Sequence, residues 1–188
     1  NVLAVAGTAF TENHVHQIRK LTQKTLLMYD GDSAGRNASV RAGYLLLRGG
    51  VEPLIVSVPN DLDPDDWVRQ DGAEAINEKI KAAQPLITYH IQLSGVRKMS
   101  PAERSKFIRG MVTEVVGIQD NIFRNEIFRS ISDEMQINER DLLAVADKEY
   151  RRRRGHRTKS DVKSNKPMFA SQKEKAQLEL VKLLAGED

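Results

Sequence analysis

Short apolar segments alternate with helical patterns along the first third of the chain. Runs rich in Val, Leu and Ile cover residues 2–6, 25–29 and 54–58. Apolar runs of this length are typical of strands that are buried on both faces of a parallel sheet. Between them, apolar positions at helical spacing predict one helix after Thr11 and a second helix over 38–47 that is closed by Gly49.

From Ser100 onward the pattern contains helical periods and no strand signal. Ser100, Pro101 and Glu103 predict a capping box with proline at the first helical position. Two further apolar stripes predict a helix that contains residues 122–131 and another that begins near Asn138. The order of these elements predicts an α/β domain, with a parallel sheet and flanking helices, followed by a small all-α bundle.

The basic residues are concentrated in one polar stretch. The whole chain has 29 Lys or Arg and 26 Asp or Glu, which gives a formal net charge of +3. Residues 151–166 contain eight of the basic residues and one acid, which leaves 21 basic and 25 acidic residues elsewhere. Because a segment this polar buries too little apolar surface to fold, we predict a flexible linker over 151–170.

These patterns divide the chain into four predicted regions. They are an α/β domain with its trailing helices over 1–94, a helical bundle over 95–150, the basic linker over 151–170, and the start of a further region over 171–188, with an amphipathic helix expected over 172–184. The chain has no cysteine, which excludes disulfides and thiolate metal sites. No apolar run approaches the roughly 20 residues of a membrane span, so we expect a cytoplasmic protein with no membrane partner.

Acidic loops follow the second and third predicted strands. Asp30-Gly31-Asp32 comes directly after the strand at 25–29, and the segment PNDLDPDD at 59–66 comes after the strand at 54–58. The carboxyl ends of parallel strands meet at one edge of a sheet, where ligands bind. We therefore expect six carboxylates at one rim, where their mutual repulsion favours a bound cation.

The type and spacing of these residues predict a site for hard divalent cations. Ligands that are all oxygens favour Mg²⁺ or Mn²⁺ over zinc. Alternate residues share a face, so Asp30 with Asp32 and Asp63 with Asp65 form two pairs that can hold two ions, as in phosphoryl transfer. Either motif alone is more often a turn or a helix cap than a functional site, so the prediction rests on their occurrence at both strand ends.

Three segments, in this order, resemble the Toprim domain of bacterial replicative primases. They are Gly7-Thr8-Ala9 after the first predicted strand, DGDSAGR at 30–36 and PNDLDPDD at 59–66. The DxD pattern alone is shared by other Toprim proteins, whereas DGDxAGR followed by DPD is much more specific to primases. The likeness continues through the predicted helices at 100–150, so it covers most of the chain.

The resemblance implies a DNA-dependent RNA polymerase, a DNA primase that makes RNA primers for replication by metal-assisted nucleotidyl transfer. The cofactor is expected to be two or more Mg²⁺ or Mn²⁺ ions, with no zinc in this part of the protein. The expected partners are a single-stranded DNA template, the RNA primer, ribonucleoside triphosphates and, through residues 171–188, the replicative helicase.

The resemblance also assigns site residues. The implied metal ligands are Asp30, Asp32, Asp63 and Asp65. Candidate contacts to phosphate or nucleic acid are Arg36, Arg41, Gly7 and Thr8. Toprim domains begin with a strand that ends in Glu-Gly, and that glutamate, central to the chemistry, is expected upstream of Asn1. No catalytic residue is therefore assigned, and we predict that these 188 residues alone do not synthesise primers.

Two other functions remain open at this point. A haloacid-dehalogenase-like phosphatase also has a strand that ends in DxD, with Asp30 as nucleophile and Asp32 as acid and base, although Ala34 replaces the usual Thr or Val. A non-catalytic replication adaptor would use the helices and leave the acidic loops without a role. The four histidines show no ligand spacing with the acidic loops, and Trp67 is predicted to fill the core beneath the second loop.

Overall fold

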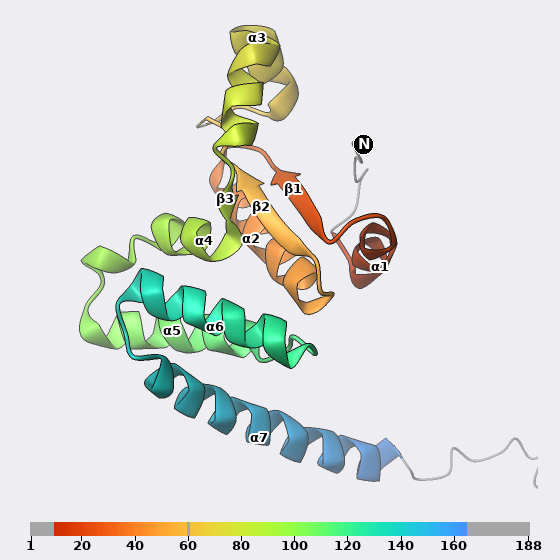
Figure 1. Cartoon of the computed structure of the whole chain (residues 1–188), viewed down its shortest axis with the longest axis vertical. Helices are drawn as coiled ribbons and strands as arrows, with labels where there is room; N and C mark the ends of the chain where they lie inside the picture. The colour runs from red at the N-terminus through yellow and green to blue at the C-terminus, as the bar shows by residue number, and fades with distance from the viewer. Residues whose placement is uncertain (1–9, 60, 165–188) are drawn as a thin grey trace, which may run out of the picture. The chain divides into compact units, whose positions relative to one another are not determined.

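Two parallel strands and the helix between them form the centre of the α/β region (Figure 1). The structure is a computed structural model that describes residues 10–59 and 61–164, with side chains through Arg153. Strand β1 (Lys24–Met28) pairs in parallel with β2 (Glu52–Val56), in a register that runs from Lys24↔Glu52 to Met28↔Val56. Helix α2 (Ser33–Arg48) connects them, as a parallel pair requires. The predicted second and third strands are thus confirmed, each beginning one or two residues earlier than expected.

The sheet is mixed, which the sequence did not predict. A third strand, β3 (Gln84–Pro85), pairs antiparallel with β2 through Leu54↔Pro85 and Ile55↔Gln84, so the strand order is β1-β2-β3. A two-residue strand has no alternating pattern to detect, and Pro85 cannot donate a hydrogen bond to the ladder, which suits an edge. The predicted parallel pairing and the α/β class are therefore confirmed, and β3 adds an antiparallel edge strand that was not expected.

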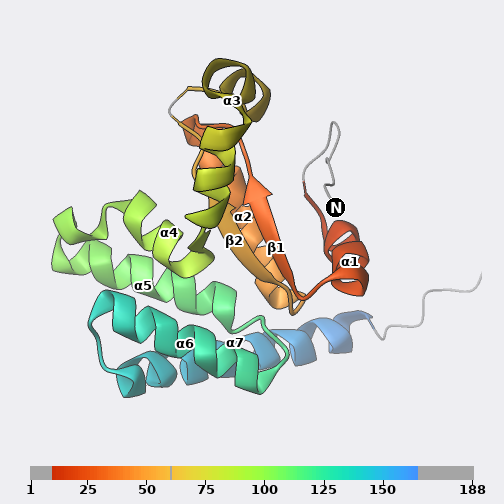
Figure 2. The same cartoon turned by 45° about the horizontal axis from the view of Figure 1, so that its top comes forward.

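Helices surround the sheet and continue beyond it (Figure 2). In chain order they are α1 (Glu12–Leu21), α2, α3 (Pro64–Lys81), α4 (Leu86–Ser94), a 3₁₀ turn (Val96–Lys98), α5 (Pro101–Val115), α6 (Asn121–Met135) and α7 (Glu139–Ser164). Helix α3 is kinked at Gly72, whose φ of 78° interrupts the helical backbone. The predicted capping box is present, because Ser100 N–H donates to Glu103 Oε2 at 2.9 Å and Glu103 N–H donates to Ser100 Oγ.

One hydrophobic core joins the α/β region to the helical bundle. It extends from Val15 in α1 to Ala146 in α7, and its fully buried side chains include Leu46, Met111 and Phe128. The core therefore continues across the domain boundary that the sequence placed between residues 94 and 95. A second, smaller cluster consists of Val56, Val58, Trp67 and Ile76, next to the point where β2 ends.

The basic stretch differs from its prediction. Helix α7 runs to Ser164, through most of the segment for which a flexible linker was predicted. Arg and Lys have high helix propensity, and no proline interrupts residues 151–164, so the composition that prevents a core does not prevent a helix. The compact unit that holds the core ends at Glu149. None of the described helices combines the length and apolar character that a bilayer span requires.

Three predicted features lie outside the described residues. They are the strand at 2–6, the turn that contains Gly7 and Thr8, and the helix expected over 172–184.

Candidate metal and phosphate site

The first acidic loop connects β1 to α2. Asp30 and Asp32 are both exposed, and Asp32 is the N-cap of α2, where its Oδ1 accepts a hydrogen bond from Gly35 N–H at 2.6 Å. An aspartate here satisfies an unpaired amide of the first turn and places negative charge at the positive end of the helix dipole. One oxygen of this predicted metal ligand is therefore occupied by the helix.

The second acidic loop connects β2 to α3 in the same way. Asp63 is the N-cap of α3, and its Oδ1 accepts from Asp66 N–H at 2.7 Å. Proline at the next position, with its fixed φ, is suited to the first helical residue. Asp65 forms an exposed ion pair with Arg69 at 2.7 Å, which contributes little to stability and leaves the carboxylate available to exchange partners.

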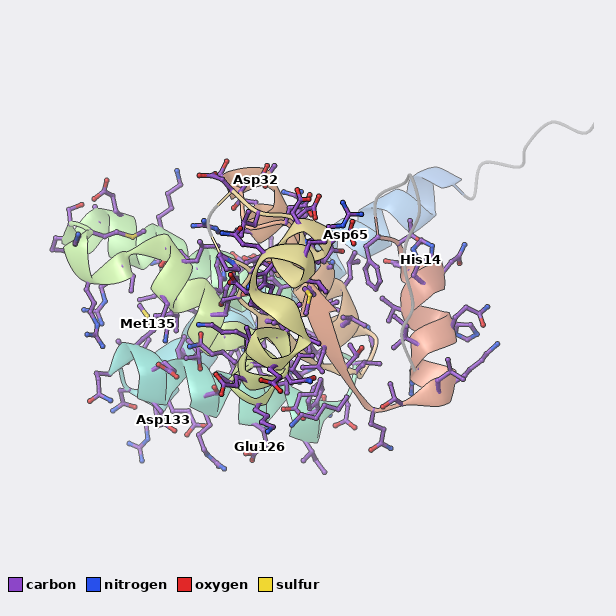
Figure 3. All side chains as sticks on the ribbon, turned by 90° about the horizontal axis from the view of Figure 1, so that it is seen from above. His14, Asp32, Asp65, Glu126, Asp133 and Met135 are labelled. Atoms are coloured by element: carbon purple, nitrogen blue, oxygen red, sulfur yellow. The ribbon has the colours of Figure 1, made fainter. Side chains whose placement is uncertain are left out.

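The two loops are in direct contact through their backbones. Gly31 N–H donates to the Leu62 carbonyl oxygen at 2.8 Å. A Cβ atom on Gly31 would lie only 1.7 Å from the Pro59 carbonyl oxygen, so only glycine allows this approach. The contact places Asp30 and Asp32 beside the loop that carries Asp63, as the sequence predicted, and Asp32 and Asp65 both lie near the upper edge of the view in Figure 3.

Arg36 fixes the conformation of the first loop. Its Nε donates to the Gly31 carbonyl oxygen at 2.9 Å, and its Nη2 donates to the same oxygen. Gly35 lies so close to Asp30 that a Cβ there would be 2.4 Å from the Asp30 carbonyl oxygen. The glycines and the arginine of DGDSAGR thus shape the loop, a positioning role for Arg36 that the sequence analysis missed.

Arg41 follows on α2 and is exposed. Burial raises the pKa of the nearby Tyr29 phenol, and the positive charge of Arg41 partly offsets that increase. The phosphate contacts expected of Arg36 and Arg41 stay predictions.

The buried side chain of Trp67 packs beneath the second acidic loop, in the small hydrophobic cluster. Its side chain is 1% exposed, within the small cluster of Val56, Val58 and Ile76, and its Nε1 donates to Asp71 Oδ2 at 3.0 Å. Burying an aromatic side chain of this size stabilises the first turns of α3 against the end of β2. The prediction that Trp67 fills the core is confirmed.

The donor atoms of the two loops fit a hard cation in their chemistry. Asp30, Asp32, Asp63 and Asp65 offer only carboxylate oxygens, which Mg²⁺ and Mn²⁺ prefer. Across residues 10–59 and 61–153, however, no three carboxylate or imidazole groups are close enough together to hold one ion by themselves. Mg²⁺ usually takes one or two carboxylates and completes its shell with water and substrate phosphate, so these loops fit partial coordination.

The histidines with described side chains lie away from this site. His14 closes the start of α1, where its Nδ1 accepts from Thr11 N–H at 3.0 Å, and His16 is exposed. His90, on α4, forms a hydrogen bond with Tyr44. As predicted, none of the three belongs to the acidic loops.

Comparisons with known proteins agree on one group of relatives. The family described as Toprim-like matches residues 1–68. A DNA primase of Staphylococcus epidermidis is 27% identical over 188 residues, which cover 99% of this chain and 30% of that protein. The chain spans about a quarter to a third of the length of the first curated relatives that it matches.

Solved structures give the same result for the fold. A DNA primase domain from Pseudomonas aeruginosa has a TM-score of 0.62 and 27% identity, over 75% of this chain and 46% of that one. A DnaG primase catalytic domain solved with single-stranded DNA has a TM-score of 0.60 and 23% identity, over 72% of this chain and 44% of that one.

Proposed function

Because the chain is homologous over most of its length to the Toprim catalytic region of bacterial DNA primases, we propose that it supplies the metal-binding edge of a nucleotidyl-transfer site. Toprim domains bind divalent metal ions. The whole enzyme would be a DNA primase, which extends an RNA primer on a single-stranded DNA template from ribonucleoside triphosphates.

The contact between the two acidic loops is the observation that carries this proposal. Gly31 bonds to Leu62 through a backbone hydrogen bond of 2.8 Å, which brings together the two loops that carry the aspartates and supports a shared site. Asp32 and Asp63 each commit one oxygen to a helix cap, which fixes the orientation of the carboxylate and leaves its second oxygen for a ligand. Bound divalent cations would neutralise the triphosphate and assist attack of the primer 3′-hydroxyl on the α-phosphorus, with loss of pyrophosphate.

The remaining partners are proposed from homology. Single-stranded DNA is bound in the primase domain that shares this fold, and we assign the same class of template to this chain. Residues 171–188 would begin the region that contacts the replicative helicase, in the cytoplasm of a bacterium. Because the four aspartates give only partial coordination, we expect the 188-residue chain by itself to bind metal without synthesising primers.

Isothermal titration calorimetry, with Mn²⁺ added to the purified chain, tests the metal site. We expect binding that Asp32→Asn and Asp63→Asn each weaken by tenfold or more. Asparagine caps helices about as well as aspartate, so these changes remove charge and keep the cap. Asp120→Asn is the matched control, because Asp120 caps α6 outside the acidic loops and accepts from Ile122 and Phe123 N–H.

Three results would contradict the proposal. Absence of Mn²⁺ binding, or binding that the loop variants leave unchanged, would favour the non-catalytic adaptor. Trapping of the chain by beryllofluoride at Asp30 would favour the phosphatase, because only an aspartyl-phosphate enzyme forms that mimic. Primer synthesis by the chain alone, on a single-stranded template with ribonucleotides, would contradict the expected inactivity.

A further inference from the structure

A cavity of about 770 Å³ lies away from the acidic loops, between α2, α4 and α5. Its apolar wall comes from Val40 and Leu45 of α2 and from Phe107 and Met111 of α5, with Met99 just before α5. This volume is within the range of small-molecule sites, which are mostly apolar with a few polar groups.

An aromatic cluster occupies the side of the cavity next to α4. The Tyr44 phenol and Nδ1 of His90 are joined by a hydrogen bond of 2.9 Å, and the ring of Phe107 meets the His90 ring edge-on at 4.9 Å between centroids. Burial raises the pKa of Tyr44 and lowers the pKa of His90 to about 4, so both side chains are neutral at pH 7. The three rings form an uncharged aromatic wall, and its partly exposed members, His90 and Phe107, offer ring faces on which a planar group can pack.

Some charged residues around the cavity form hydrogen bonds or ion pairs with their neighbours, and two of them form no salt bridge. Glu103 accepts from the Ser100 amide and hydroxyl, and Glu114 pairs with Arg48 at 3.5 Å. In the described part of the chain, no carboxylate lies within salt-bridge distance of Arg41 or Lys106, which also line the cavity. The cavity therefore presents two cations that form no salt bridge with a carboxylate of the described residues.

Gly110 leaves the cavity open and lowers the stability of helix α5. It lies within the helix and lines the cavity, and a Cβ atom placed there would meet no heavy atom within 4 Å. Glycine inside a helix is less stable than alanine by roughly 0.5–1 kcal/mol. Gly110 is exposed, so it lies at the open side of the cavity, where a larger side chain would reduce the available volume.

We propose that this cavity is a binding site for a small aromatic anion. The planar body of such a ligand packs against Phe107 and the Tyr44–His90 pair, and its anionic group is held by Arg41 and Lys106. The ligand is a small molecule because the volume of this open cavity is in the range of such sites and because two cations border its apolar wall. None of the residues that line the cavity belongs to the acidic loops, and the binding of such a ligand is measured without nucleotidyl transfer.

The fluorescent probe 1-anilinonaphthalene-8-sulfonate, an aromatic sulfonate, tests the site on the 188-residue chain. We expect saturable binding of one probe per chain, which Gly110→Leu weakens by tenfold or more because leucine fills the cavity. Ser105→Leu, which adds the same side chain at an exposed position of α5, should leave the affinity unchanged. Circular dichroism and thermal melting establish that both variants are folded.

A variant that lacks both cations tests whether Arg41 and Lys106 hold the anionic group of the ligand. Arg41→Gln combined with Lys106→Gln should weaken binding of the sulfonate tenfold and leave binding of neutral N-phenyl-1-naphthylamine within twofold. Lys98→Gln, an exposed lysine outside the cavity, is the control. Equal affinity of wild type and folded Gly110→Leu would overturn the proposal, as would equal losses for both probes. A dimer in sedimentation velocity that the probe dissociates would assign the cavity to a second copy of the chain and also overturn it.

Discussion

A methyl group on Gly31 would meet the Pro59 carbonyl oxygen at 1.7 Å, whereas one on Gly110 would meet no heavy atom within 4 Å. The acidic edge of the sheet is held by backbone contacts between two loops, which tolerate no added atom. The face shared by α2 and α5 is held by side chains around a cavity and has room for more. The same residue type therefore marks close backbone contact in one region and open space in the other.

Gly31→Ala should have the largest effect and breaks the contact between the acidic loops. Because the opposing atoms belong to the backbone, relief requires one loop to move, and we expect a loss of about 3 kcal/mol in the free energy of unfolding. Mn²⁺ binding should fall at least tenfold in the same variant. Urea denaturation and calorimetry measure both, and unchanged metal affinity would show that the loop contact does not position the aspartates.

Acidification tests the aromatic cluster beside the cavity. Burial lowers the pKa of His90 from 6.5 to about 4, so between these values the unfolded chain binds a proton that the folded chain does not. The stability that the neutral imidazole contributes is fully present above about pH 6.5 and is lost as the pH falls toward 4. The free energy of unfolding should decrease by on the order of 2 kcal/mol over this range.

The variant His90→Gln keeps an acceptor for Tyr44 and removes the titrating ring. Urea denaturation at several pH values should therefore give a flatter curve for this variant than for wild type between pH 6.5 and 4. The exposed His16 provides the control, because His16→Gln should retain the dependence of the wild type. Parallel curves for wild type and His90→Gln would contradict the assignment of this pH dependence to His90.

Arg36→Met removes the hydrogen bonds from the guanidinium to the Gly31 carbonyl oxygen and keeps most of the side-chain volume. We expect a loss of about 1.5 kcal/mol in the free energy of unfolding, because hydrogen bonds from charged groups contribute about that much. Arg41→Met, at an exposed position of the same helix, should change stability by less than about 0.5 kcal/mol. Equal effects of the two changes would show that Arg36 does not fix the loop.

Gly110→Ala should have the smallest effect, and in the opposite direction. The methyl group enters open space and the helix gains propensity, so we expect an increase of about 0.8 kcal/mol in the free energy of unfolding. Thermal melting of the variant beside Gly31→Ala compares the two regions directly. A decrease would show that position 110 is closely packed, which would contradict the open cavity.

Local sequence signals were sufficient to predict many of the strands and helix ends of this protein. The apolar runs gave β1 and β2, and Ser100 with Glu103 gave the start of α5, because hydrophobic period and helix caps act over a few residues. The acidic residues after both strands predicted that two loops would meet, and the Gly31–Leu62 hydrogen bond agrees. The assignment of Asp30, Asp32, Asp63 and Asp65 as metal ligands stays a prediction.

The tertiary structure alone decided which groups meet across long stretches of chain. Strand β3 exists because α3 returns residues 84–85 to the edge of β2, and the core crosses the expected boundary because α2 packs against α4 and α5. The cavity depends on the separation of those three helices, which no local pattern encodes. Periodicity and capping are properties of neighbouring residues, whereas close backbone contacts and the shape of a cavity depend on elements that meet only when the chain is folded.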